Sequence, residues 1–196
     1  MATTGAHDWD AARHGEDPRA AEALWWAAAA VQGHARSSNF TSISAALAQS
    51  GQPSEASWPY PQGKLAAAPE EPSLACGAPP WRAASIAKLE LKRDGHEAAV
   101  ESRLGAGSPV ILVLRVTDEF DQPDLNGVIA APAAKAPNRG NHAVLAIGAR
   151  EVDGAGRHLL IRNSWGPKWA VEGHALLPLR YLATHGLWAA TVRGLA

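Results

Sequence analysis

Cysteine is almost absent from this sequence: Cys76 is the single one among 196 residues. One thiol excludes a disulfide framework within the chain and a cysteine-rich zinc site. Long apolar runs are also lacking, since the longest, Ala23–Val31, has about half of the ~20 residues that a membrane span requires. Residues 1–19 have neither the basic nor the apolar region of a secretory signal. We therefore expect a cytoplasmic protein with no membrane partner.

The chain also has no large excess of positive or negative charge. The chain has 18 Lys and Arg against 19 Asp and Glu, a net charge of −1 that gives no electrostatic reason to expect nucleic acid as a partner. Eight histidines invite a metal site, but most of them are scattered without the i, i+4 spacing that a helical site uses. We expect no metal and no cofactor. The scattered histidines are His7, His14, His34, His96, His158, His174 and His185.

Helix formers dominate the first part of the chain. Residues 1–17 are polar and are expected to be irregular, whereas 18–32 predict a buried helix with Asp17 as its cap, Pro18 in its first turn and Gly33 at its end. A second short helix is expected over 41–49, with Ser and Thr residues before it as caps. Most of the prolines follow in 51–84, which predicts a long irregular segment.

Strands dominate the second part. Val110–Val116 is a nearly continuous apolar run and predicts a buried strand, and a loop is expected over 118–140. Alternating residues on both sides of a Gly-containing turn at 153–156 predict a β-hairpin of 143–152 with 157–165. Helices early and antiparallel strands late indicate an α+β fold. The other expected elements are strands at 86–91, 173–177 and 187–193 and a helix within 95–107.

Three segments carry a family resemblance. Asn141-His142-Ala143-Val144-Leu145 is followed about twenty residues later by Asn163-Ser164-Trp165-Gly166-Pro167-Lys168-Trp169, and Trp58-Pro59-Tyr60 lies upstream of both. Together and in this order they resemble the papain family of cysteine peptidases, in particular its bacterial members. The resemblance implies a single papain-like domain over 1–196, with a mainly helical left lobe at about 1–85, a mainly β right lobe at about 86–196 and a cleft between them.

The same resemblance assigns roles to residues. His142 corresponds to the catalytic imidazole, Asn163 to the residue that orients it, and Trp165 and Trp169 to the indoles that shield their hydrogen bond. Asn141 and Trp58 are expected to contribute to binding. Trp58 has a second interpretation that is equally open, in which it and Trp81 anchor the Pro-rich segment instead of lining a peptide groove.

The nucleophile of the family is missing. It belongs at the start of the long buried helix, where the helix dipole lowers the pKa of a thiol. Setting the helix end on the family pattern puts Glu22 at that position and Glu16 where the family has its oxyanion glutamine, whereas alignment on Trp25 would put Leu24 at the nucleophile position. Residues 5–36 contain no Cys, Ser, Thr or Lys, so no shift of the register by two or three residues supplies a nucleophile.

Three functions are compatible with these residues. The first is a catalytically defective pseudopeptidase whose inherited cleft binds a peptide, a protein partner or a small ligand. The second is an altered enzyme in which Glu22, His142 and Asn163 perform acid–base chemistry, for example within a biosynthetic pathway. The third is an active thiol peptidase that uses Cys76 or a cysteine from another subunit. In the first two, Glu22 is expected to form an ion pair with His142.

Overall fold

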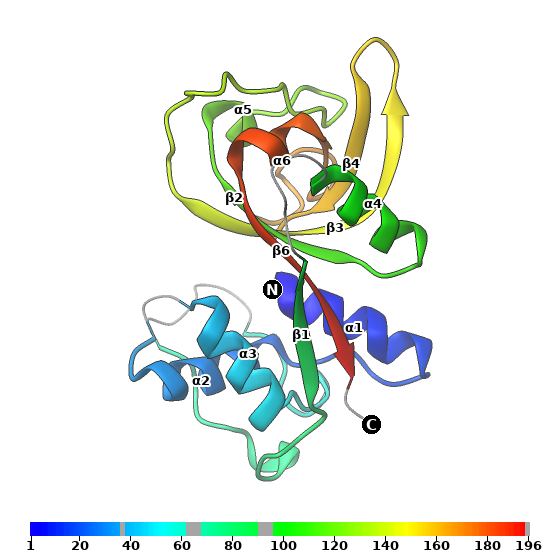
Figure 1. Ribbon diagram of the computed structural model, residues 1–196. Coiled ribbons are helices and arrows are strands. Elements are labelled where there is room, and N and C mark those ends of the chain that lie inside the picture. The colour runs from blue at the N-terminus through cyan, green and yellow to red at the C-terminus, as the bar shows by residue number, and fades with distance from the viewer. Residues whose placement is uncertain (36–37, 62–67, 90–95, 195–196) are drawn as a thin grey trace. The chain divides into compact units, whose positions relative to one another are not determined.

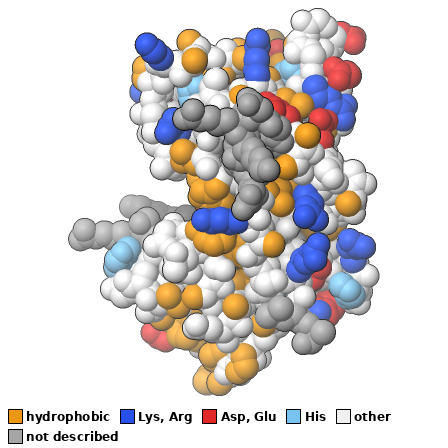
Figure 2. All heavy atoms as spheres, in the orientation of Figure 1, with side chains coloured by type: hydrophobic (Ala, Val, Ile, Leu, Met, Phe, Trp, Pro, Cys, Tyr) orange, Lys and Arg blue, Asp and Glu red, His pale blue; other side chains and the backbone are white. Residues whose placement is uncertain are grey.

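The structure is a computed structural model that describes residues 1–35, 38–61, 68–89 and 96–194 (Figure 1). It divides into two compact units. Unit 1 consists of Met1, Thr3–Ala87 and the returning segment Val192–Ala196, and unit 2 consists of Ala2 and Lys88–Thr191. Charged side chains of both signs are interspersed on the face drawn in Figure 2. No helix of the described residues has the length and apolar character needed to cross a bilayer.

Three α-helices form most of unit 1 (Figure 1). They are α1 (Ala2–Arg13), α2 (Ala21–Gln32) and α3 (Phe40–Gln49), and a 3-10 turn, η1 (Leu74–Cys76), interrupts the Pro-rich segment that follows them. Helices α2 and α3 pack against each other. Strand β1 (Ala84–Leu89) leads out of this unit.

The prediction that residues 1–17 are irregular is wrong, because α1 occupies most of them. This helix has a polar composition, yet it buries Thr3, Thr4, Ala6, His7 and Ala11. Two of its buried polar side chains bond to Gln52 in the same unit: His7 Nδ1 donates to Gln52 Oε1, and Thr4 Oγ1 accepts from Gln52 Nε2. Tertiary contacts of this kind stabilise a helix that propensity and hydrophobic pattern do not reveal.

Helix α2 begins later than predicted. Ala20 is its N-cap residue and makes no side-chain cap, so neither Asp17 nor Pro18 has the expected role. The main chain just before α2 is instead held by unit 1, because the Ala20 N–H donates to the Pro53 carbonyl over 3.0 Å. The predicted end is confirmed: Gly33 adopts the left-handed conformation, with φ 78°, that glycine reaches without strain.

Helix α3 starts at Phe40, one residue before the predicted 41–49. Its cap is an asparagine and not the Ser or Thr expected: the Asn39 side chain accepts from the Ser42 N–H, and the Ser42 hydroxyl accepts from the Asn39 N–H. This reciprocal pair is a capping box.

A tryptophan cluster holds the Pro-rich segment against α2. The rings of Trp26, Trp58 and Trp81 make three mutual edge-to-face contacts with centroids 6.1–6.3 Å apart. Trp58 is only 3% exposed, and the Trp81 indole N–H donates to the Cys76 carbonyl over 2.8 Å. Of the two interpretations of Trp58 and Trp81, the structure therefore supports the anchoring of the segment.

Unit 2 is built on an antiparallel sheet. The strand order of the whole sheet is β1-β6-β2-β3-β4-β5, and β6 passes from unit 2 into unit 1. Figure 1 shows β3 and β4 as the long hairpin that the sequence predicts. The elements after β1 are α4 (His96–Gly105), β2 (Val110–Arg115), α5 (Asp118–Asp121), β3 (Asn141–Val152), β4 (Gly156–Arg162), β5 (His174–Pro178), α6 (Arg180–His185) and β6 (Gly186–Gly194).

Two short helices of unit 2 are not among the predicted elements. Helix α5 lies in the segment expected to be a loop, and α6 lies between the last two strands. Both bury aromatic side chains in the core of this unit: Phe120 from α5 and Tyr181 from α6 are each 0% exposed. One aromatic side chain in so short a helix gives no periodicity that a sequence reading could detect.

The tight loop after Trp169 supplies a stability prediction. Glu172 has φ 51°, a left-handed conformation that costs a non-glycine residue energy, and its side chain is exposed. Glu172→Gly is expected to raise the free energy of unfolding by about 0.5 kcal/mol, because relief of strain exceeds the added entropy of the unfolded chain. Urea denaturation would measure it.

The neighbouring Gly173 is the matched control. Its φ is 79°, and an added Cβ would lie 3.3 Å from the Gly166 carbonyl oxygen, so Gly173→Ala is expected to lower the free energy of unfolding by at least about 1 kcal/mol. If both substitutions raised the free energy of unfolding, or both lowered it, this account of the loop would be wrong.

Candidate functional site

The β3–β4 hairpin brings His142 and Asn163 together. His142 is the second residue of β3, and Asn163 follows the last residue of β4. Leu145 pairs with Arg162 in the antiparallel register. Continuing this register brings Trp165 opposite His142, with Asn163 as its diagonal neighbour on the same face. The distance of about twenty residues in the sequence is therefore what a hairpin with this turn requires.

A short hydrogen bond joins the two side chains. His142 Nε2 lies 2.7 Å from Asn163 Oδ1, and the same oxygen accepts the Ser164 backbone N–H at 2.7 Å. The Ser164 donor identifies this atom as the amide oxygen, so Nε2 carries the imidazole proton. The other nitrogen, Nδ1, then has the free lone pair. His142 is held in the tautomer that a general base needs.

Burial determines the charge of this imidazole. Desolvation lowers the pKa of His142 below its ordinary value, and the hydrogen bond to Asn163 opposes the shift. Within unit 2, His142 is therefore neutral at neutral pH. The expected ion pair with Glu22 joins the two units and stays a prediction.

Aromatic rings surround the pair on the side of unit 2. The Trp165 ring lies 4.8 Å from the His142 ring, and Trp165 contacts Trp169 with centroids 5.8 Å apart. Trp169 is 9% exposed, whereas Trp165 is 43% exposed. Trp169 therefore supports the site from within the core, and Trp165 presents an indole surface to its surroundings.

Phe120 is a member of this cluster that the sequence analysis did not identify. Its ring is stacked on Trp169, with centroids 5.4 Å apart, and it meets the edges of Trp165 at 5.5 Å and of His142 at 6.3 Å. The only sequence signal is its position: a lone aromatic residue in a Pro- and Ala-rich segment directly after a buried strand.

Asn141, the remaining expected site residue of unit 2, contributes through its main chain. Asn141 pairs with Arg115 at the start of β3, and its side chain is exposed. Strand pairing positions His142 beside it, opposite Leu114 on β2.

The acidic candidates lie in unit 1. Glu22 is the second residue of α2, is 3% exposed, and accepts a long hydrogen bond of 3.4 Å from the Glu70 N–H. Burial raises the pKa of the Glu22 carboxyl, and the nearby Glu70 adds to the shift while the hydrogen bond opposes it. Leu24, the alternative at the nucleophile position, is the fourth residue of α2 and is buried. Glu22 is thus the candidate nearer to the helix start.

Glu16 makes ion pairs instead of presenting a free carboxylate. Its side chain contacts Arg19 directly and lies 3.4 Å from the Arg82 Nε. A carboxylate offers no hydrogen-bond donor, so it does not supply what an oxyanion site requires.

Cys76 lies in the 3-10 turn η1 and packs against the tryptophan cluster. Its thiol donates to the Ser73 carbonyl over 2.8 Å. A nucleophilic cysteine needs a base or a helix start, and η1 has three residues. In the parts of the chain that the structure covers, no three His, Cys, Asp or Glu side chains converge into a metal site.

Comparison with known proteins gives one family match and several similar sequences. The profile "Papain family cysteine protease" matches residues 30–181, more than half of the chain. Pro-cathepsin H of Bos taurus is 31% identical over 104 residues, and a peptidase C1-like protein of Acanthamoeba polyphaga mimivirus is 29% identical over 96 residues. These alignments cover 52% and 48% of the chain but only 30% of each relative's own length.

Solved structures resemble the whole chain. Xylellain, a cysteine protease from Xylella fastidiosa, superposes with a TM-score of 0.77 and 21% identity, over all of this chain and 78% of its own. The bromelain protease from Ananas comosus gives 0.67 and 14% identity, over 98% of this chain and 85% of its own. The predicted α+β, papain-like fold is thereby confirmed. The chain belongs to the papain family of cysteine proteases, without a cysteine at the start of α2.

Proposed function

We propose that this chain is a catalytically defective papain-like peptidase whose inherited cleft binds a peptide, a protein partner or a small ligand. The observation that carries the proposal is the first turn of α2, which holds a buried carboxylate, Glu22, and no thiol, although the family chemistry needs a thiol at the start of this helix. His142 and Asn163 keep the geometry of a base and its orienting amide, but a base without a nucleophile forms no acyl-enzyme.

The surface beside His142 supports retained binding. Trp165 is 43% exposed although it packs on the His142 and Phe120 rings. A rigid indole held in this way offers apolar contact area at little entropic cost. We therefore assign to Trp165 a contact with the bound peptide.

One experiment tests both parts of this proposal. The protein is incubated with a pool of peptides from a proteome digest, and the bound and unbound peptides are identified by mass spectrometry. We expect bound peptides to be recovered uncut, and Trp165→Ala to reduce their capture at least about fivefold, since about 1 kcal/mol is a factor of five. Trp9→Ala removes a similarly exposed indole, 47% exposed, from α1 and is the matched control.

Two results would contradict the proposal. New cleavage sites that disappear in His142→Ala would reveal an active peptidase, and their loss in Cys76→Ser would identify a relocated nucleophile. Equal capture by Trp165→Ala and the parent protein would remove Trp165 from the binding surface.

A second function is favoured by the acid–base properties of two residues. The raised pKa of Glu22 favours a carboxyl that can donate a proton, and the lowered pKa of His142 keeps its imidazole neutral and able to accept one. Acid–base catalysis by Glu22, His142 and Asn163 on a small substrate is the alternative. Substrate turnover that fails in both Glu22→Gln and His142→Ala, with no thiol reagent affecting it, would establish it.

A further inference from the structure

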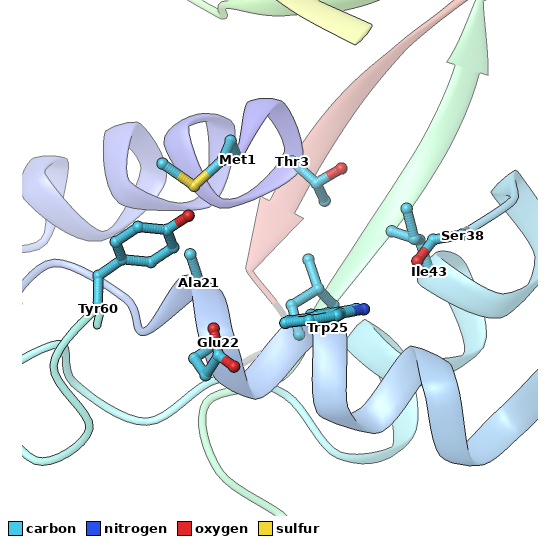
Figure 3. A pocket seen from close by; sticks show the side chains of 9 residues that line it. Met1, Thr3, Ala21, Glu22, Trp25, Ser38, Ile43 and Tyr60 are labelled. Atoms are coloured by element: carbon cyan, nitrogen blue, oxygen red, sulfur yellow. The ribbon is translucent and has the colours of Figure 1, made fainter. Parts of the chain in front are cut away.

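Unit 1 contains a cavity that lies between its three helices and the segment after α3. Its volume is about 310 Å³, at the lower end of the range for sites that hold small molecules. Figure 3 shows the Glu22 carboxylate between the Tyr60 ring and the Trp25 indole in that view. The lining side chains come from Met1, Thr3, Ala21, Glu22, Leu24, Trp25, Ser38, Ile43 and Tyr60.

Among the side chains that line the cavity, Glu22 is the charged one, and it is poorly compensated. Glu22 is 3% exposed, and its carboxylate accepts a long hydrogen bond of 3.4 Å from the Glu70 N–H. The ion pairs identified among the described residues do not include Glu22. A buried carboxylate in this state stays costly until a cation or strong donors approach it.

Tyr60 faces the same carboxylate. Burial raises the pKa of the Tyr60 phenol, and the charge of Glu22 adds to the effect. The phenol therefore keeps its proton at neutral pH and remains a hydrogen-bond donor. Tyr60 and Thr3 provide hydroxyls to the cavity, but neither provides a positive charge.

The other walls are apolar and exclude several classes of ligand. Leu24, Trp25 and Ile43 offer hydrocarbon and an indole ring, and so does Met1 with its thioether chain. A bare divalent metal ion needs several oxygen ligands, and one carboxylate does not supply them. An anion would be repelled by Glu22, and a neutral apolar molecule would leave the carboxylate uncompensated.

We propose that this cavity binds a primary ammonium group carried on a small apolar body, with the ammonium on Glu22 and the body against Trp25, Leu24 and Ile43. The cavity lies wholly within unit 1, so the proposal does not depend on peptide binding beside Trp165. It goes beyond the proposed function by naming a ligand class and a second site. An ammonium next to an indole also gains a cation–π contribution.

The probe is 2-phenylethylamine, with 2-phenylethanol as its neutral analogue and 3-phenylpropanoate as its anionic one. Titration calorimetry at pH 8 is expected to give a dissociation constant of the order of 1 mM or below for the amine, as a ligand of about nine non-hydrogen atoms allows. We expect the alcohol to bind at least tenfold more weakly and the anion not at all.

Glu22→Gln keeps the shape of the side chain and removes the charge. It is expected to weaken amine binding at least tenfold and to leave alcohol binding unchanged. Because the pKa of Glu22 is raised, the carboxyl becomes protonated on acidification before an exposed glutamate does, and amine affinity must fall with it. Glu151→Gln, an equal charge change on the exposed part of β3 in unit 2, is the control.

A thermal melt of each variant shows that it is folded, and removing a buried charge gives no reason for Glu22→Gln to unfold. Equal affinity for the amine and the alcohol, or full amine binding by Glu22→Gln, would overturn the proposal. Neither result bears on peptide cleavage, so failure here is distinguishable from failure of the proposed function.

Discussion

Phe120→Ala is expected to lower the free energy of unfolding by about 3–5 kcal/mol, the range for removing a fully buried aromatic side chain. Phe120 is 0% exposed and its ring contacts Trp169, Trp165 and Tyr181. Its removal leaves a cavity among closely packed rings, which can relax into the space only in part. Denaturation by guanidinium chloride, followed by tryptophan fluorescence, measures the change.

Two further substitutions make this prediction specific. Phe120→Leu keeps most of the volume and is expected to cost less than about 1.5 kcal/mol. Leu125→Ala truncates an apolar side chain that is fully exposed, and it is expected to stay within about 0.5 kcal/mol of the parent. A loss from Phe120→Ala as small as that from Leu125→Ala would show that Phe120 does not support the site.

Gln52→Leu is expected to have an effect of similar size in unit 1. The Gln52 amide is 0% exposed; it donates to Thr4 Oγ1 at 3.1 Å and to the Ala20 carbonyl at 2.8 Å, and it accepts from His7 Nδ1 at 3.0 Å. Leucine would leave three buried polar atoms without partners, at about 1 kcal/mol or more for each. The free energy of unfolding should therefore fall by about 3 kcal/mol.

The free energy of unfolding of this variant should be measured at pH 8. Burial lowers the pKa of His7, so its contribution to stability is complete above the ordinary value of about 6.5 and is lost as the pH falls below it. The double variant His7→Leu/Gln52→Leu removes both ends of one hydrogen bond and should lose less than the two single variants together. Gln49→Leu, at the exposed end of α3, is the control. Strict additivity would contradict the coupling of His7 to Gln52.

The sequence predicts unit 2 better than unit 1, and the reason lies in how each is held together. The β3–β4 hairpin, its turn and the pair formed by His142 and Asn163 follow from alternation and a local turn. Helix α1 depends on contacts such as His7 with Gln52, residues 45 positions apart, which leave no local pattern. The same holds for Phe120, whose neighbours come from β3, α6 and the loop after β4.

The sequence also predicts some features of the candidate site and not others. A motif identifies His142 and Asn163 by type and spacing, and the structure gives them the expected hydrogen bond. The sequence also names Glu22, but its burial and the cavity beside it depend on how α1, α3 and the segment of Tyr60 pack around the start of α2. These packing contacts decide what Glu22 binds, and they are not encoded in a short motif.

The passage of β6 from unit 2 into unit 1 has a consequence for the order in which the protein forms. The Gly194 N–H donates to the Asp10 carboxylate over 3.0 Å, so residues 184 positions apart complete the same unit. On the ribosome, most of unit 1 is synthesised first but lacks this strand segment until β6 has been made. Unit 2 ends at Thr191 in the same strand, so neither unit can complete its fold until β6 has been made.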